Sequence, residues 1–160
     1  MTIRVGDTIP NVRVHVLGES GPETRQTGEI FSGKRAVMFA LPGAFTPTCS
    51  RSHLPGYVEH AQEIRSRGVE LIACLSVNDA WVMGAWGKAH GAGDKVLMLA
   101  DGNADFSRAV GLHVDMQGAG FGVRSSRYAM ILDNGVLTHL NTEEPRKFEV
   151  SDALSILALL

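Results

Sequence analysis

Apolar residues occur in short blocks separated by polar, glycine-containing segments, a pattern typical of buried strands alternating with helices. Three nearly continuous apolar blocks, at 35–41, 69–77 and 95–100, have the length of strands rather than of helices. Residues 12–16 alternate valine with polar side chains, which predicts a half-buried strand. The segment 18–28 is polar and rich in glycine, so we expect an exposed loop or an irregular hairpin there.

Helical spacing of apolar residues follows the first two of these blocks. Residues 48–67 predict a helix, in which the early Pro55 should cause a kink or an irregular turn and which Gly68 should end. Asn78 or Asp79 is expected to cap the next helix, which continues to about residue 89.

The C-terminal part of the chain predicts a short helix, a hairpin and a last helix. The short helix covers 103–110, and the hairpin joins strands at 127–132 and 136–140 through an Asn-Gly turn. Ser151 and Asp152 precede a last helical segment and can cap it. Strands alternating with helices, followed by a hairpin, predict an α/β fold with a central mixed β-sheet flanked by helices.

The composition predicts one domain spanning residues 1–160 and excludes several classes of protein. With 160 residues and a net charge of −2, the chain has no electrostatic reason to bind nucleic acid or an acidic membrane. No apolar run approaches the ~20 residues of a membrane span, and residues 1–7 lack the character of a signal peptide. Two cysteines do not make a disulfide framework, so a reducing, cytoplasmic setting is expected.

The segment Pro42-Gly-Ala-Phe-Thr-Pro-Thr-Cys-Ser50 carries the clearest chemistry. It places Cys49 between a predicted buried strand and the start of a predicted helix. Unpaired N–H groups and the helix dipole there stabilise thiolate over thiol, and the thiolate is the nucleophile. Thr46 offers a hydroxyl nearby that can donate or accept a hydrogen bond, and Pro42 and Pro47 stiffen the loop. The alternative, a small buried cysteine that only fills the core, does not explain these neighbours.

The spacing of Pro42, Thr46 and Cys49 resembles the peroxidatic motif of the peroxiredoxins. Further segments are similar to the type II, or peroxiredoxin-5-like, branch of that family: 74–79, 85–86, 99–101 and 127–128. This resemblance runs from about residue 5 to about residue 152. It implies a thioredoxin-like fold with peroxiredoxin insertions, and a homodimer with an interface near the active site.

The resemblance also implies a thiol-dependent peroxidase that reduces hydrogen peroxide and alkyl hydroperoxides without a metal or other cofactor. Cys49 would attack the peroxide, become a sulfenic acid and be recycled by a thiol. The Thr46 hydroxyl and the N–H groups of Thr48 and Cys49 are candidate donors to the reacting oxygens. By resemblance Arg127 supplies the positive charge, with Arg124 as a second candidate.

Cys74 lies inside the apolar block 69–77, where a buried and inert thiol is the favoured interpretation. It is also a possible resolving cysteine, provided that the segment around Cys49 rearranges. The family's other position for a resolving cysteine corresponds to residues 144–152, which contain none. We therefore expect an external reductant, either glutathione with glutaredoxin or thioredoxin.

Two other functions remain open at this point. A peroxide sensor or an oxidation-triggered chaperone would use the same Cys49 with slow turnover. A thiol–disulfide oxidoreductase is disfavoured because the chain has no Cys-x-x-Cys motif. The six histidines show no metal-ligand spacing, and His53 is expected to be exposed on its helix. Exposed members of the aromatic set Phe45, Trp81 and Trp86 would face a partner.

Overall fold

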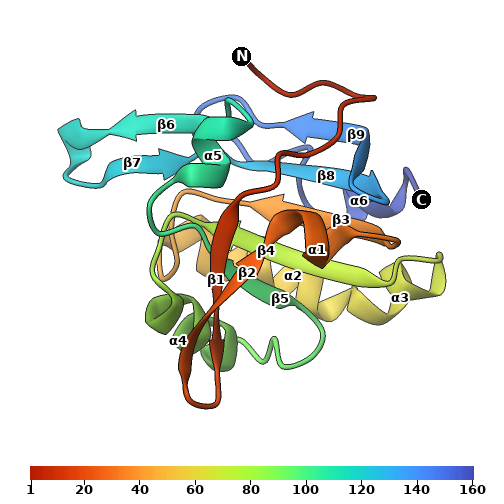
Figure 1. The fold of residues 1–160 in the computed structure, drawn as a ribbon, viewed down its shortest axis with the longest axis horizontal. Helices are drawn as coiled ribbons and strands as arrows, with labels where there is room; N and C mark the ends of the chain where they lie inside the picture. The colour runs from red at the N-terminus through yellow and green to blue at the C-terminus, as the bar shows by residue number, and fades with distance from the viewer.

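The computed structural model describes all 160 residues, and a seven-stranded mixed sheet forms its centre (Figure 1). The strand order is β2-β1-β5-β4-β3-β8-β9. Strands β3, β4 and β5 are parallel to one another, and the other pairings are antiparallel. The strands span β1 Arg13–Gly18, β2 Gly21–Gln26, β3 Arg35–Ala40, β4 Leu71–Ser76, β5 Leu97–Ala100, β8 Tyr128–Asp133 and β9 Val136–Thr142.

Helices cover both faces of this sheet, which confirms the predicted α/β fold. They are α1 Thr27–Phe31, η1 Cys49–His53, α2 Leu54–Glu59, α3 Ala61–Ser66, α4 Ala80–Ala89, α5 Asp105–Ala109 and α6 Ala153–Leu157. Figure 1 shows α1 and α5 on the near face, with α2 and α3 behind the sheet. Each face has its own buried cluster of apolar side chains.

Strand β3 explains why its apolar block is nearly continuous. Val37 and Phe39 point into the cluster beneath α2 and α3, whereas Ala36 and Met38 point into the cluster on the opposite face. All four side chains are fully buried. A strand covered on both faces needs apolar residues at every position, and this strand leads directly into the segment that contains Cys49.

Local signals in the sequence placed several boundaries correctly. The Asp79 carboxylate accepts a hydrogen bond from Val82 N at 2.9 Å and caps α4. Asp152 caps α6 in the same way. Asn134 and Gly135 both have positive φ, 51° and 76°, as a tight hairpin turn requires.

Three segments differ from the prediction. The helix expected over 48–67 is interrupted at His60, where the backbone leaves helical geometry (φ −97°, ψ 9°). The segment 18–28 forms most of a regular hairpin, because β2 pairs with β1 along six residues. A second hairpin was not predicted, since most of its residues are exposed and give no apolar alternation; it consists of β6 His113–Met116, the 3-10 turn η2 Gln117–Ala119 and β7 Gly122–Ser125.

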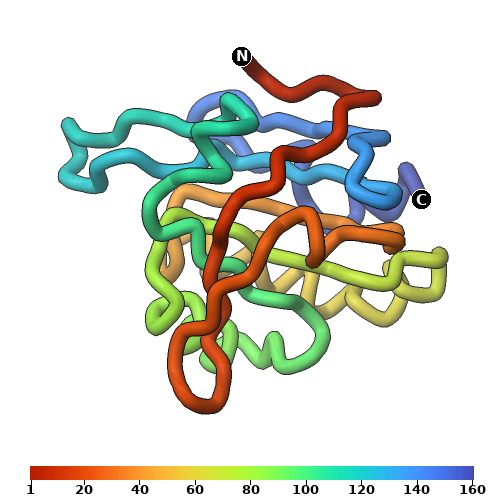
Figure 2. The backbone as a smooth tube through the Cα atoms, in the orientation of Figure 1, coloured from red at the N-terminus to blue at the C-terminus, as the bar shows by residue number.

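The backbone trace shows this β6–β7 hairpin projecting from the body of the molecule (Figure 2). The N-terminal segment runs along the β8–β9 hairpin. Gly6 N donates to Leu137 O at 2.8 Å, and Ile9 N donates to Gly135 O at 2.9 Å. None of the helices combines the length and the apolar character needed to cross a membrane.

Candidate active site

Cys49 lies in the first turn of the helix that follows β3. The turn begins at Pro47, and Ser50 N donates to Thr46 O at 2.9 Å. The N–H groups of Thr48 and Cys49 donate to no acceptor within the protein. Two unpaired donors and the positive end of the helix dipole therefore lie next to the sulfur, as the sequence predicted.

The turn that contains Cys49 is a π-helix rather than an α-helix. Leu54 N donates to Cys49 O, five residues earlier, and Pro55, which has no N–H group, follows at once. This is the irregular turn that Pro55 predicted. The indole N–H of Trp86 donates to Ser50 Oγ at 2.9 Å and ties the turn to α4. Trp86 is fully buried, so this bond anchors the turn that contains Cys49 to the core.

Arg127 brings a positive charge to the sulfur. It lies immediately before β8, and its Nη2 atom donates to Cys49 Sγ at 3.1 Å. Arg124, the other candidate, points elsewhere: its Nη1 atom donates to Pro42 O at 3.2 Å. Its guanidinium also lies over the ring of Phe121. Arg124 thus braces the loop before Cys49, and Arg127 contacts the reactive atom.

His53 was expected to be exposed, and this prediction was wrong. Its side chain is fully buried, with Nδ1 2.8 Å from Arg127 Nη1 and Nε2 3.1 Å from Ser151 O. A carbonyl only accepts, so Nε2 carries the proton and Nδ1 accepts from Arg127. Burial, reinforced by the charge of Arg127, lowers the pKa of His53 to about 3. The ring is therefore neutral and holds the guanidinium in place.

Thr46 is oriented as an acceptor toward the site. Its hydroxyl donates to Gly43 O at 2.6 Å, which uses its single proton. The sequence allowed Thr46 either to donate to the peroxide oxygens or to accept from them, and this geometry leaves only its lone pairs for the substrate. A hydroperoxide has one O–H group of its own, and that group can donate to Thr46 Oγ1.

A cleft of about 530 Å³ opens next to these residues. Thr46, Thr48 and Arg127 line it, together with Val114 and Met116 of β6. The loop after β9 contributes residues 143–148 to the lining. The unpredicted β6–β7 hairpin therefore shapes the entrance to Cys49.

Comparison with known proteins identifies the family. The model of the redoxin family matches residues 4–157. The chain belongs to the redoxin family. Within it, the chain is similar to type II peroxiredoxins: it is 47% identical to peroxiredoxin-2E-2, chloroplastic, of Oryza sativa, over 99% of this chain and 73% of the relative. It is 42% identical to peroxiredoxin-2B of Arabidopsis thaliana, over 99% and 98% of the two chains.

Solved peroxiredoxin structures have the same fold. Reduced Prx3 of Vibrio vulnificus in complex with hydrogen peroxide superposes with a TM-score of 0.95 and 53% identity, covering 99% of each chain. Peroxiredoxin 5 of Alvinella pompejana gives a TM-score of 0.86 and 35% identity, covering 98% of this chain and 96% of that one. The protein is therefore a thiol-dependent peroxidase with a thioredoxin-like fold.

This peroxiredoxin brings most of the predicted site residues together. Thr46, Thr48 and Arg127 line the cleft next to Cys49, and Pro42 lies at its edge. No group of three His, Cys, Asp or Glu side chains is placed to hold a metal ion. Sequence reasoning missed the buried position of His53, because the atoms that define it come from Ser151 and from Arg127.

The second cysteine of this peroxiredoxin, Cys74, lies in the middle of β4, paired in register with Phe39. It is fully buried, in the same apolar cluster as Cys49, and both thiols are free. Burial raises the pKa of Cys74 well above its usual value, and the neighbouring Cys49 raises it further. A neutral thiol without solvent access is a poor nucleophile.

Proposed function

We propose that this peroxiredoxin reduces hydrogen peroxide and alkyl hydroperoxides at Cys49, with Arg127 as its main electrostatic partner. The observation that carries this proposal is the 3.1 Å contact between Arg127 Nη2 and Cys49 Sγ beneath an open cleft. Thiolate sulfur attacks the terminal peroxide oxygen, the O–O bond breaks, and the other oxygen leaves as alkoxide or hydroxide. Cys49 becomes a sulfenic acid, and the leaving oxygen takes up a proton to form alcohol or water.

Each neighbouring group has a defined part in this step. Arg127 stabilises the negative charge as it moves from sulfur to the leaving oxygen. Thr46 Oγ1 accepts the O–H of the hydroperoxide, which orients the O–O bond. The free N–H groups of Thr48 and Cys49 donate to the oxygens. Pro42, whose carbonyl is held by Arg124, keeps this loop in position.

The walls of the cleft support alkyl hydroperoxides as well as hydrogen peroxide. Val114, Met116 and Phe148 offer apolar surface in the lining of the cleft. An alkyl group that leaves water for this surface gains roughly 0.8 kcal/mol per methylene buried. Hydrogen peroxide has no alkyl group to bury against these apolar side chains, so its binding depends on the polar groups next to Cys49 alone.

An external thiol recycles the enzyme in this proposal. Cys74 is the only other cysteine, and its burial in β4 separates it from solvent. Glutathione condenses with the sulfenic acid to give a mixed disulfide and water, and glutaredoxin or a second thiol then releases Cys49; thioredoxin is the alternative reductant. A cycle of this kind fits a reducing compartment such as the cytoplasm, although the relative named above from Oryza sativa is chloroplastic.

A homodimer completes the proposal. Phe45, four residues before Cys49, is 58% exposed, and Trp81, in the first turn of α4, is 61% exposed, although both are large aromatic side chains. Phe45 also has a positive φ of 61°, a backbone conformation that is uncommon for a bulky residue. A second copy of the chain would cover this apolar surface.

The test is the intact mass after one equivalent of peroxide, with and without glutathione. The proposal expects one added oxygen on Cys49 alone and a glutathione adduct when the thiol is present. Steady-state peroxide consumption with excess reductant then distinguishes an enzyme from a peroxide sensor or an oxidation-triggered chaperone. A Cys49→Ser variant that still consumes peroxide at the wild-type rate would overturn the assignment.

A further inference from the structure

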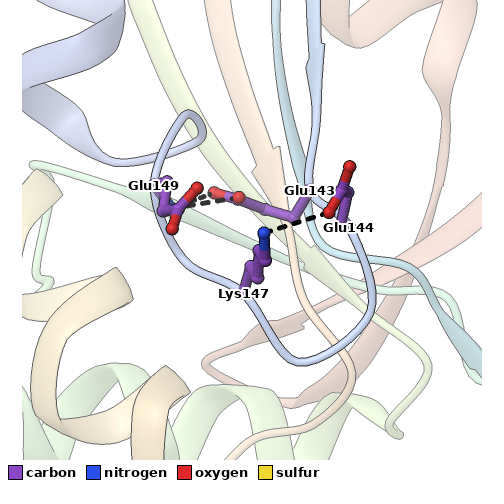
Figure 3. A network of polar contacts seen from close by, with 4 residues as sticks. All are labelled: Glu143, Glu144, Lys147 and Glu149. Carbon is purple, nitrogen blue, oxygen red and sulfur yellow. Dashed lines mark hydrogen bonds and ion pairs between the residues drawn. The ribbon is translucent and has the colours of Figure 1, made fainter.

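The carboxylate of Glu143 has an unusual set of partners. Glu143 follows β9 directly, and its side chain turns back into its own loop toward Glu149 (Figure 3). Its oxygens accept from Glu149 N at 3.0 and 2.9 Å, from Val150 N at 2.9 Å, and from Ser151 N at 2.8 Å. The Ser151 hydroxyl donates to it as well, at 2.7 Å. No lysine or arginine takes part, because Lys147 pairs with Glu144.

These hydrogen bonds require the ionised carboxylate. Burial alone would raise the pKa of Glu143, but the donors from Ser151, Glu149 and Val150 outweigh burial and lower it. Hydrogen bonds to a charged acceptor are about twice as strong as neutral ones. The charge of Glu143 therefore closes the loop 143–151 and fixes the position of Ser151.

Ser151 provides the backbone acceptor for the active-site histidine, His53. Its carbonyl accepts from His53 Nε2 at 3.1 Å and from Tyr57 OH at 2.7 Å, and all three side chains are fully buried. The same loop places the ring of Phe148 4.9 Å from the His53 ring. The guanidinium of Arg127 lies 5.7 Å from the centre of the Phe148 ring.

Two connections thus lead from Glu143 to the sulfur. The first passes through Ser151 and His53 to the guanidinium of Arg127, which contacts Cys49. The second is in the backbone, where Glu143 N donates to Arg127 O at 3.0 Å. The side chain of Glu143 makes no hydrogen bond to Cys49, whereas Arg127 does, so we expect its effect on the reaction to pass through Arg127.

We propose that Glu143 is a positioning residue for peroxide reduction, which holds Ser151 and His53 so that Arg127 stays against Cys49. This inference rests on the proposed function of Arg127. Loss of the carboxylate frees the loop, tilts the His53 ring and lets the guanidinium move away from the sulfur. Attack on peroxide then slows, because the developing charge on the leaving oxygen loses its partner.

The test compares Glu143→Gln with Glu149→Gln. Both substitutions remove one charge from the same loop, but the Glu149 side chain makes no hydrogen bond, and only its backbone N–H takes part. We expect Glu143→Gln to lower the second-order rate with peroxide about tenfold, the equivalent of ~1.4 kcal/mol, and Glu149→Gln to keep the wild-type rate. Alkylation of Cys49 by iodoacetamide, which breaks no O–O bond, should slow less than peroxide attack does in Glu143→Gln and should be unchanged in Glu149→Gln.

Combination with Arg127→Ala decides whether the effect passes through Arg127. The double variant Glu143→Gln/Arg127→Ala should react with peroxide as slowly as Arg127→Ala, and no slower. A further tenfold loss in the double variant, or an equal loss with peroxide and iodoacetamide, would overturn the inference. If Glu143→Gln does not fold, Ser151→Ala removes one donor and should give a smaller loss of the same kind. A wild-type rate in Arg127→Ala would instead reject the proposed function.

Discussion

Nδ1 of His53 lies 2.8 Å from Nη1 of Arg127, and this contact fixes the charge state of the histidine. An arginine is always protonated and only donates, so Nδ1 must offer its lone pair. A second positive charge on the buried ring would face the guanidinium directly. Burial has the larger effect on this histidine, and the charge of Arg127 adds to it. Together they lower the pKa of His53 to about 3.

This low pKa predicts a loss of stability in mild acid. The unfolded chain has an ordinary histidine pKa of about 6.5, so between that pH and about 3 only the unfolded state binds the proton. The free energy of unfolding should therefore fall as the pH is lowered through this window, by at most about 1.4 kcal/mol per pH unit from this one group. Urea denaturation at pH 7, 5.5 and 4.5 measures the fall.

His53→Gln is the control, because glutamine can still donate to Ser151 O but cannot bind a proton. Carboxyl groups such as Glu143 contribute equally to both proteins, so the difference between the two curves isolates His53. We expect the variant to be less stable than the wild type at pH 7 and the gap to narrow at pH 4.5. Parallel curves would mean that the ring does not resist protonation.

Arg127→Ala should lower the rate of peroxide attack by at least about tenfold, which corresponds to ~1.4 kcal/mol for one charge-assisted hydrogen bond. Arg127→Lys should recover only part of this rate. Arginine contacts His53 through Nη1 and Cys49 through Nη2, and the single nitrogen of lysine cannot make both contacts. Stopped-flow measurement with hydrogen peroxide compares the three proteins, and equal rates for arginine and lysine would show that charge alone is needed.

Thr46→Val should also slow the reaction, while Thr46→Ser should retain most of it. Valine has nearly the same shape but offers no oxygen to the O–H of the hydroperoxide, and it leaves Gly43 O without its donor. A lost hydrogen bond of ~1 kcal/mol predicts roughly a fivefold fall or more. Single-turnover rates with hydrogen peroxide test this expectation. Full activity in Thr46→Val would remove Thr46 from the reacting site.

Local patterns in the sequence were sufficient to predict the frame around Cys49. The apolar block of β3, the polar turn after it and Pro55 each act within a few residues, so they place Cys49 at an irregular helix start without knowledge of the rest of the fold. The choice of Arg127 over Arg124 was different. It came from the family resemblance, because nothing local distinguishes the two arginines.

The environment of His53 could not be predicted, because it depends on residues far away in the chain. Its partner Ser151 lies 98 residues later, and Arg127 lies 74 residues later. Burial of a polar side chain on a helix depends on which face packs against the loop after β9. The β6–β7 hairpin was missed for a related reason: His113, Val114 and Asp115 are exposed, so the strand lacks an alternating apolar pattern.

Trp81→Lys should shift the oligomeric state toward the monomer. The side chain is 61% exposed on α4, and in the proposed dimer the partner covers it. Leu154→Lys is the matched control, because Leu154 is equally exposed, at 60%, but lies on α6, away from α4 (Figure 1). Sedimentation equilibrium measures the mass of each protein. A monomeric wild type, or equal dissociation of both variants, would contradict the proposed dimer surface.

Cys74→Ser should turn over at a near-wild-type rate when glutathione and glutaredoxin supply the electrons. Cys74 is enclosed between β3 and β5 in the centre of the sheet, so we expect a bond to the oxidised Cys49 to require that the first helical turn and the strand both rearrange. Burial also raises the pKa of Cys74, which keeps the thiol neutral and slow to attack. The sulfenic acid on Cys49 therefore remains available to thiols from solution, and to further oxidation by peroxide when thiols are scarce. Peroxide turnover with glutaredoxin, and separately with thioredoxin, measures the contribution of Cys74. Loss of activity with both reductants, together with a Cys49–Cys74 disulfide in the mass spectrum of the wild type, would make this an internal two-cysteine peroxidase instead.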